Sequence, residues 1–394
     1  MRGRLFEAAR SKRDLIRGII EKLRSGEPPL TNVRIENLPS PSPRGSRLPH
    51  AAEDGGSRLV EFEAYSVFIV RGWASSYGGE GGSYGTLVEA EYSDVGVMVP
   101  QRYSEERARM YRETLEALAA RDVLPAIDGG LLLWDGSLRP LVARHRPGVA
   151  EVGMSEAISE LKGRLGMDLA EALAEMARLW LEGEAPAAPL LVSSRVGVDD
   201  LKDEDGGWIA FLEWTEKLAA LRSLLEEAWR RGVTPVFITK TSRSTSFFGR
   251  SLPDVYYLKR LRRFDPFMTE YRVRRGLEEL RGLERSRVRG PLLPEDGGLD
   301  SFYRERLGLL EFYVRLDPGA PILKVEIAFD LEEGGDPGAS VERVVSALES
   351  LPRARGYPLS LTIAHRRAHL GSEEVERILD LLGLELERRE RWML

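Results

Sequence analysis

Two aspartates that precede glycine are the residues best placed for chemistry in this sequence. Asp54 opens an Asp-Gly-Gly-Ser segment, and Asp135 follows the apolar run Leu131–Trp134. A carboxylate at the end of a buried strand projects above a rigid sheet, and a neighbouring glycine lets a bulky anionic substrate approach the backbone. Because Asp-Gly is also a common tight-turn dipeptide, a plain turn is the alternative for each pair.

A helical glutamate and a histidine could join these aspartates. Glu113 and Glu116 lie in a predicted helix between the two motifs, although a solvated helix face would carry the same residues. His365 ends an apolar segment that we expect to be a strand, and a structural histidine is the alternative there. Three carboxylates and a histidine can hold two divalent cations about 4 Å apart, an arrangement that cleaves phosphodiesters. Hard oxygen ligands favour Mg²⁺ or Mn²⁺.

Composition excludes several other classes of site. The 394 residues include no cysteine and four histidines, which rules out disulfides, thiolate metal sites and a cysteine nucleophile. No apolar run approaches the ~20 residues needed to span a bilayer. The first twenty residues alternate charged and apolar side chains and lack the apolar segment of a signal peptide. We therefore expect a cytoplasmic protein with no membrane contact.

Charge is unevenly distributed along the chain. The net charge is −6, yet residues 1–50 carry 11 basic and 5 acidic residues, and residues 240–290 carry 14 basic and 6 acidic ones. Aromatic residues interleave with the arginines of the second stretch. This combination suits phosphate contact with base stacking on a single strand. An amphipathic helix with core-facing aromatics and solvated arginines is the alternative.

The periodicity predicts a mixed α/β sheet flanked by helices. We divide the chain into an N-terminal helix and linker (1–50) and an α/β domain (51–394) with a mostly helical insertion at about 151–232. Strand patterns cover 59–74, 87–99, 130–134, 235–239, 309–316, 321–329 and 359–364. Helical patterns cover 5–23, 103–121, 155–165, 169–183, 208–231, 254–283, 340–351 and 373–388.

Five motifs occur in an order that resembles the NurA nuclease family, the partner of the HerA helicase. They are AAEDGGS, LLLWDGSL, VFITKTSRS, FYVRLDPGAPILKVEIA and GYPLSLTIAHRRA, and they extend over roughly residues 45–390. The resemblance implies an RNase H-like core, a homodimer and action on DNA with Mn²⁺, or Mg²⁺ as the alternative. It also implies 5′–3′ exonuclease and single-strand endonuclease activity in end resection for recombinational repair.

The resemblance also assigns roles to individual residues. Glu116 is preferred to Glu113 because it lies closer to Asp135 in the sequence. The departure is the first motif, which reads DGGS here where the family usually has DGS. The implied metal ligands, for two ions, are Asp54, Glu116, Asp135 and His365. The implied substrate contacts are Lys240, which is also counted as catalytic, Arg243, and Tyr257 or its neighbour Tyr256.

Two rival functions come from other classes. Actin-like and sugar-kinase ATPases also use Asp-Gly turns to hold phosphate, but they need a second glycine-rich phosphate loop that this sequence lacks. A non-catalytic helicase adaptor is the other rival. An adaptor has no physical need to gather carboxylates that repel one another.

Overall fold

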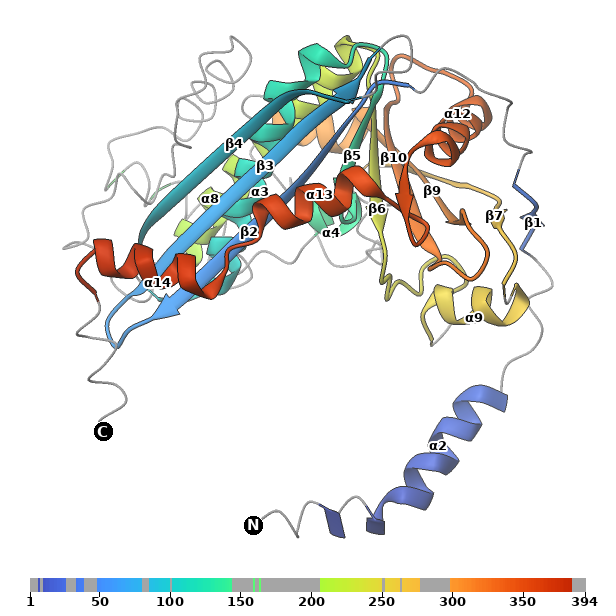
Figure 1. The fold of residues 1–394 in the computed structure, drawn as a ribbon, viewed down its shortest axis with the longest axis horizontal. Helices are drawn as coiled ribbons and strands as arrows, with labels where there is room; N and C mark the ends of the chain where they lie inside the picture. Colours follow the sequence, from blue (N-terminus) through green and yellow to red (C-terminus); the bar gives the residue numbers. More distant parts are fainter. Residues whose placement is uncertain are drawn as a thin grey trace. The chain divides into compact units, whose positions relative to one another are not determined.

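A computed structural model gives the fold (Figure 1). It describes residues 6–7, 10–25, 33–38, 48–79, 85–99, 101–143, 159, 163, 206–249, 252–262, 264–276 and 298–384. The chain divides into two compact units, Met1–Ile35 and Glu36–Leu394. The first contains helix α2 (Arg13–Ser25), which confirms most of the helical pattern predicted there. Among the described helices, none is long and apolar enough to cross a membrane.

A ten-stranded mixed sheet forms the centre of the fold. Its order is β1-β7-β9-β10-β6-β5-β2-β3-β4, and β8 also pairs with β9. Strand β5 runs parallel to both β2 and β6, whereas β2-β3-β4 and β6-β10-β9 are antiparallel. The strands are β1 (Ile35–Glu36), β2 (His50–Glu61), β3 (Ser66–Gly78), β4 (Gly85–Met98), β5 (Leu131–Asp135), β6 (Thr234–Thr239), β7 (Phe267–Thr269), β8 (Arg272–Arg275), β9 (Leu307–Arg315) and β10 (Leu323–Asp330).

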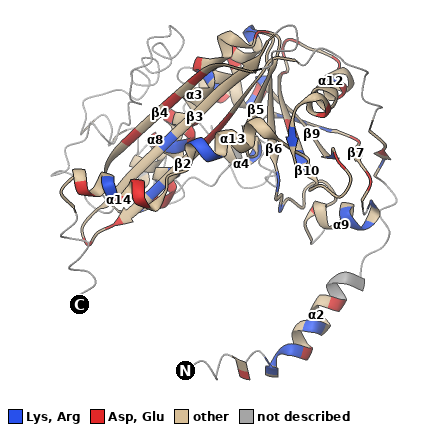
Figure 2. Ribbon diagram, in the orientation of Figure 1, with Lys and Arg blue, Asp and Glu red and all other residues tan. Residues whose placement is uncertain are grey.

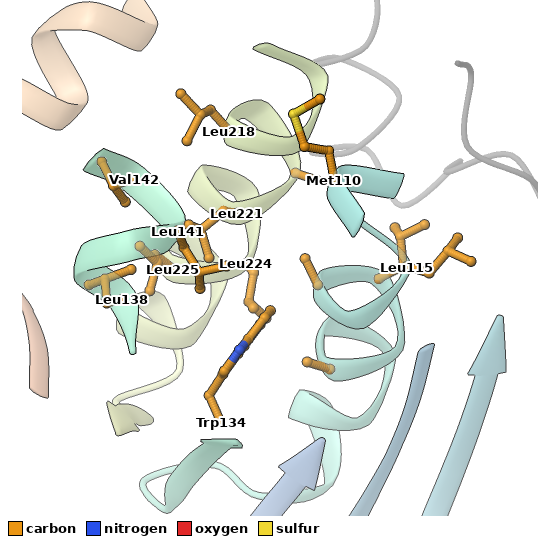
Figure 3. Close-up of a cluster of buried hydrophobic side chains, with 14 of the residues drawn as sticks. Met110, Leu115, Trp134, Leu138, Leu141, Val142, Leu218, Leu221, Leu224 and Leu225 are labelled. Atoms are coloured by element: carbon orange, nitrogen blue, oxygen red, sulfur yellow. The ribbon is translucent and has the colours of Figure 1, made fainter. Parts of the chain in front are cut away.

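Helices cover both faces of this sheet (Figure 1). Helices α3 (Ser104–Val123), α4 (Leu138–Ala143) and α8 (Gly206–Arg230) share one core with alternate strand residues such as Trp134. Figure 3 shows Trp134 among leucines of α4 and α8. Helices α12 (Pro337–Ser350) and α13 (Leu359–Ala368) share a second core with residues of the opposite parity, such as Leu133. Strand alternation thus assigns each β5 side chain to one face.

Shorter elements complete the described part. They are η1 (Leu124–Ala126), α9 (Asp254–Leu261), α11 (Leu299–Ser301), η5 (Phe302–Arg306), β11 (Arg353–Ala354), β12 (Tyr357–Pro358) and α14 (Ser372–Leu381). Strands β11 and β12 form a separate two-stranded sheet that leads into α13. Helix α14 adds a third, small apolar cluster against the outer part of β3.

The predicted mixed sheet flanked by helices is confirmed. The strands expected at 87–99, 130–134, 235–239, 309–316 and 321–329 and the helices expected at 103–121, 208–231 and 340–351 form, with ends that shift by a few residues. The helices expected at 155–165 and 169–183 lie outside the described residues, apart from 159 and 163.

Three predicted elements are wrong. The segment 359–364 begins helix α13, because Leu361, Ala364 and Ala368 are buried at helical spacing rather than in alternation. The expected strand 59–74 spans a hairpin between Glu61 and Ser66. The expected helix 254–283 ends at Leu261 and gives way to β7 and β8. A helix through this whole range is also disfavoured by Pro266, which restricts Asp265.

Candidate functional site

Three side chains that are distant in the sequence converge on the α13 face of the sheet. Asp54 lies in β2, Asp135 ends β5 beside it, and His365 is in α13. One ligand-type atom of each lies within 4.8 Å of the other two. His365 Nδ1 is 2.7 Å from Asp54 Oδ2, within hydrogen-bond distance. Two carboxylates and an imidazole at this spacing are a donor set that suits a hard divalent cation.

Asp54 does not stand at a strand end, as the sequence suggested; it lies inside β2, which continues to Glu61. Its backbone pairs with Trp73 of β3. Its Oδ1 accepts a hydrogen bond from the Gly55 amide at 2.8 Å. Asp135 stands at the end of β5, as predicted from the buried run before it.

The glycines of the DGGS motif allow two helices to pack directly on the strand backbone. Gly55 and Gly72 are paired across β2 and β3, and a Cβ at either position would overlap α3 at Leu115 or Glu116. A Cβ on Gly56 would overlap the carbonyl of Ala368 in α13. These glycines therefore bring α3 and α13 onto opposite faces beside Asp54.

Lys240 and Tyr357 border the cluster. Lys240 follows β6, and its Nζ lies 3.0 Å from Asp135 Oδ2. The same ammonium lies 3.9 Å from the centre of the Tyr357 ring, a cation–π geometry. Burial first, and then the charge of Asp135, raise the pKa of the Tyr357 hydroxyl. Lys240 is about one-third exposed at 36%, so it is accessible to a substrate.

Two buried glutamates approach the cluster from the α3 side. Glu53 Oε1 accepts a hydrogen bond from the Asp135 amide at 3.2 Å, whereas its buried Oε2 has no hydrogen-bond partner. Burial, followed by repulsion from Glu116, Asp54 and Asp135, raises the pKa of Glu53 well above its usual value. Burial raises the pKa of Glu116 to about 8, although Arg112, 3.0 Å away, opposes the shift.

Asp54 experiences the same repulsion. Burial and then the charge of Asp135 raise its pKa, while the contact with His365 lowers it. Several acids therefore share a small volume with too few cations, and one of their oxygens is buried without a partner. A divalent cation would relieve both costs. The residues present thus fit a metal ion.

The two candidate glutamates on α3 have different surroundings. Glu113 Oε2 lies 3.1 Å from Lys217 Nζ of α8, so its charge is balanced within the core. Glu116 lies against Gly55 and is repelled by Asp54. Geometry therefore places Glu116, and not Glu113, next to the cluster, although Glu116 is not one of the three residues whose ligand atoms meet.

The predicted substrate residues lie in two further places. Arg243 is exposed in the loop after β6. Tyr257 is 4% exposed in α9, with its ring against those of Phe248 and Tyr256. The tyrosine beside Asp135 and Lys240 is Tyr357.

Sequence reasoning missed Glu53 and Tyr357. Glu53 adjoins Asp54 and follows two buried alanines, Ala51 and Ala52, which was its only local signal. Tyr357 is the central residue of the Gly-Tyr-Pro motif. Figure 2 shows a basic end on α13, where exposed Arg366 and Arg367 follow His365. Basic residues beside an acidic cluster attract a polyanion towards it.

Comparisons with known proteins find chains of the same fold. The chain is similar to the crystal structure of the NurA nuclease from Sulfolobus solfataricus, with 19% identity, a TM-score of 0.63, and coverage of 99% of this chain and 98% of that one. It is similar to a NurA structure with manganese (15% identity, TM-score 0.61, 95% and 98% coverage). It is also similar to NurA bound to dAMP and manganese (16% identity, TM-score 0.52, 97% and 94% coverage).

These structural similarities establish the fold, and the sequence match establishes the family. None of the curated proteins matches this chain. Residues 50–370 match the NurA domain, a range that includes Asp54, Asp135 and His365. The chain belongs to the NurA family.

Proposed function

We propose that this chain is a metal-dependent nuclease that hydrolyses phosphodiester bonds in DNA. The observation that carries the proposal is the convergence of Asp54, Asp135 and His365 within 4.8 Å of one another. Membership of the NurA family supports the activity. The similarity to a NurA structure bound to dAMP and manganese supports a nucleotide substrate and Mn²⁺, with Mg²⁺ as the alternative.

The metal ligands in this proposal are Asp54, Asp135, His365 and Glu116. Glu116 approaches from the α3 side, and its pKa of about 8 in the metal-free chain would fall next to a cation. Four ligands from both sides of β2 suit two ions. When bound, such ions activate a water and stabilise the leaving oxygen. Glu53 positions Asp135 by accepting a hydrogen bond from its backbone amide.

Lys240 has a different role from the acids. Its ammonium lies between Asp135 Oδ2 and the Tyr357 ring, and about one-third of the side chain is exposed. We propose that it contacts the scissile phosphate and offsets charge that accumulates there. The Tyr357 ring holds the ammonium in place without neutralising it.

The finer parts of the proposal come from the family resemblance. They are an RNase H-like architecture, 5′–3′ exonuclease and single-strand endonuclease activity, a homodimer, and work with a HerA-type helicase in DNA end resection in the cytoplasm. The repulsion among Glu53, Glu116 and Asp54 speaks against a pure adaptor, since an adaptor gains nothing from that cost. An ATPase would require a phosphate loop beside the acids; the glycines of DGGS instead serve helix packing.

The test is cleavage of single-stranded DNA labelled at the 5′ or the 3′ end. The wild-type chain, Asp54→Ala and Asp380→Ala are incubated with Mn²⁺, Mg²⁺ or EDTA. Asp380 is an exposed acid on α14 and serves as the matched control. We expect metal-dependent cleavage by the wild type and by Asp380→Ala, and its loss in Asp54→Ala. Equal cleavage by all three, or cleavage in EDTA, would contradict the proposal.

A further inference from the structure

A cavity of about 830 Å³ opens at the carboxyl ends of β5 and β6. Eleven described residues line it: seven are serine or threonine, three are the basic residues Arg139, Arg243 and Lys324, and one is Pro140. None of these eleven is acidic. The volume lies in the range of roughly 300–1,000 Å³ that small-molecule sites occupy. A space with these walls suits an anion.

The cavity and the carboxylate cluster lie on opposite faces of the same strand ends. Lys324 of β10 pairs in register with Thr239, and both lie on the face that α4 covers. Lys240, the next residue, points to the other face and contacts Asp135. Ser137 follows Asp135 by two residues, so their Cα atoms are at most about 7 Å apart. One extended ligand could reach both places around the end of the sheet.

The wall of the cavity is held in shape by a buried carboxylate outside it. Asp254, at the start of α9, accepts hydrogen bonds from the amides of Phe247 and Phe248 at 3.1 and 3.0 Å. It also accepts one from the Tyr313 hydroxyl at 2.8 Å. The guanidinium of Arg272 lies 4.3 Å from the Phe247 ring centre. The loop after β6 is therefore preformed, which limits the entropy lost on binding.

The cations of the cavity differ in how far their charge is balanced. Lys324 is buried, and its Nζ lies 2.7 Å from Glu311 and 2.6 Å from Glu326. Arg243 is exposed, and no carboxylate in the described part of the chain forms an ion pair with it. Arg243 therefore supplies charge that a ligand can use. A guanidinium with several hydroxyls is the typical donor set for phosphate, without selection among bases.

We propose that this cavity binds a backbone phosphate of the nucleic-acid strand whose neighbouring phosphate is cleaved at the carboxylate cluster. The strand passes around the end of the sheet beside Gly136, where Thr239 and Lys240 face opposite sides. Arg243 and the hydroxyl-bearing loop then fix the position of the strand relative to the scissile bond. This inference rests on the proposed nuclease function and adds the path of its substrate.

The test measures binding of fluorescein-labelled (dT)15 in EDTA, by anisotropy, at several salt concentrations. The variants are Arg243→Ala and Thr241→Glu, which remove a cation or add an anion at exposed positions of the cavity. Arg377→Ala, an exposed arginine of α14, is the matched control. Losing one phosphate contact should reduce the slope of log K against log salt by about 0.7, which corresponds to about eightfold weaker binding at roughly 50 mM salt.

Each outcome decides for or against the cavity. Both cavity variants are expected to bind (dT)15 more weakly and to show a shallower slope of log K against log salt. Arg377→Ala is expected to match the wild type. An unchanged salt slope in Arg243→Ala would overturn the assignment of a phosphate to this cavity. Weaker binding by Arg243→Ala with unchanged binding by Thr241→Glu would overturn it as well. A defect seen with thymidine monophosphate and not with (dT)15 would reassign the cavity to a released product. Because the titration needs no cleavage, an inactive wild-type chain would contradict the nuclease proposal and leave this test valid.

Discussion

Two groups of acids lie on opposite faces of the same sheet, and only one is electrostatically balanced. On the α4 face, the ammonium of Lys324 lies 2.7 Å from Glu311 and 2.6 Å from Glu326. The guanidinium of Arg274 lies 3.8 Å from Glu311, so this group has two cations for its two acids. On the α13 face, Asp54 and Asp135 meet with His365, and the nearest ammonium, that of Lys240, is partly exposed. The pKa values reflect the difference. Burial lowers the pKa of Lys324, but the charges of Glu326 and Glu311 outweigh it and raise that pKa. The pKa of Asp54 is raised by burial and by repulsion from Asp135.

We therefore expect the first group of acids to serve the fold and the second to serve the proposed chemistry. A buried ion pair with its counter-charge supplied internally needs nothing further, and breaking it costs stability. A group of acids left without enough cations lowers stability in the metal-free chain and gains a function when a cation arrives. The same residue types thus have opposite consequences when mutated.

The largest expected effect is on catalysis at the unbalanced group. Asp135→Asn should reduce the rate of DNA cleavage by at least about 10³-fold, because metal-ion stabilisation is worth several kcal/mol. Its metal-free stability should be unchanged or higher, since the substitution removes repulsion from Asp54 and Glu53. Initial rates and urea unfolding measure the two quantities. A variant that is unstable yet active would reverse the comparison.

The balanced group should show the opposite result. Lys324→Met should lower the free energy of unfolding by about 3–5 kcal/mol, because it leaves Glu326 buried without its cation and Glu311 with only the more distant Arg274. Urea denaturation measures the change. Adding Glu311→Gln and Glu326→Gln should recover much of the loss. A loss below about 1 kcal/mol would show that this ion group does not support the fold.

Helix packing at the DGGS motif gives a smaller effect. Gly55→Ala places a Cβ where the Glu116 carboxylate lies, and such overpacking costs about 1–3 kcal/mol. Cleavage should fall as well, since Glu116 must move. Gly371→Ala is the control, because nothing lies within 4 Å of its Cβ position. Equal stability of the two variants would show that α3 does not need this close approach.

The pH dependence of metal-free stability is the most gradual effect, because one titrating group changes the free energy of unfolding by at most about 1.4 kcal/mol per pH unit. The pKa of Glu116 is raised from 4.5 to about 8 in the folded chain, so the native state holds more protons than the unfolded state in that interval. Its contribution to stability is therefore lost as pH rises through that interval. His50 has the opposite effect on stability below pH 6.5. Burial lowers its pKa to about 4, so its contribution to stability is lost as pH falls through that interval.

The contribution of Glu116 is isolated by subtracting the stability of Glu116→Gln at each pH. Thermal unfolding in EDTA gives the free energy of unfolding of each protein. The value for the wild type minus the value for the variant should become more negative towards pH 8. Saturating Mn²⁺ should abolish or reverse that trend for the wild type. A difference that grows more positive with pH would mean that Glu116 is stabilised as an anion without metal.

A site residue could be predicted from the sequence where local interactions determine its position, and could not where contacts between distant segments determine it. Asp135 was predictable because the buried run before it defines a strand and its end. His365 was assigned to a strand because Leu359, Leu361 and Ile363 alternate; it lies on a helix because tertiary packing selects Leu361, Ala364 and Ala368.

Glu53 and Tyr357 illustrate what local patterns cannot provide. Their importance depends on contacts with Asp135 and Lys240, which are about 80 or more residues away along the chain. No local periodicity encodes such pairs. The glycine beside Asp54 was expected to make room for a substrate, with a tight turn as the alternative, because the helices that the DGGS glycines accommodate lie far along the sequence.

Asp54, Asp135 and His365 are proposed to form a site for a divalent cation. The most direct measurement is a Mn²⁺ titration, with free ion followed by electron paramagnetic resonance, of the wild type, Asp54→Asn and Asp380→Asn. We expect saturable binding to the wild type and to Asp380→Asn, and binding at least about tenfold weaker in Asp54→Asn. Equal affinity in all three proteins, or no binding to the wild type, would contradict it.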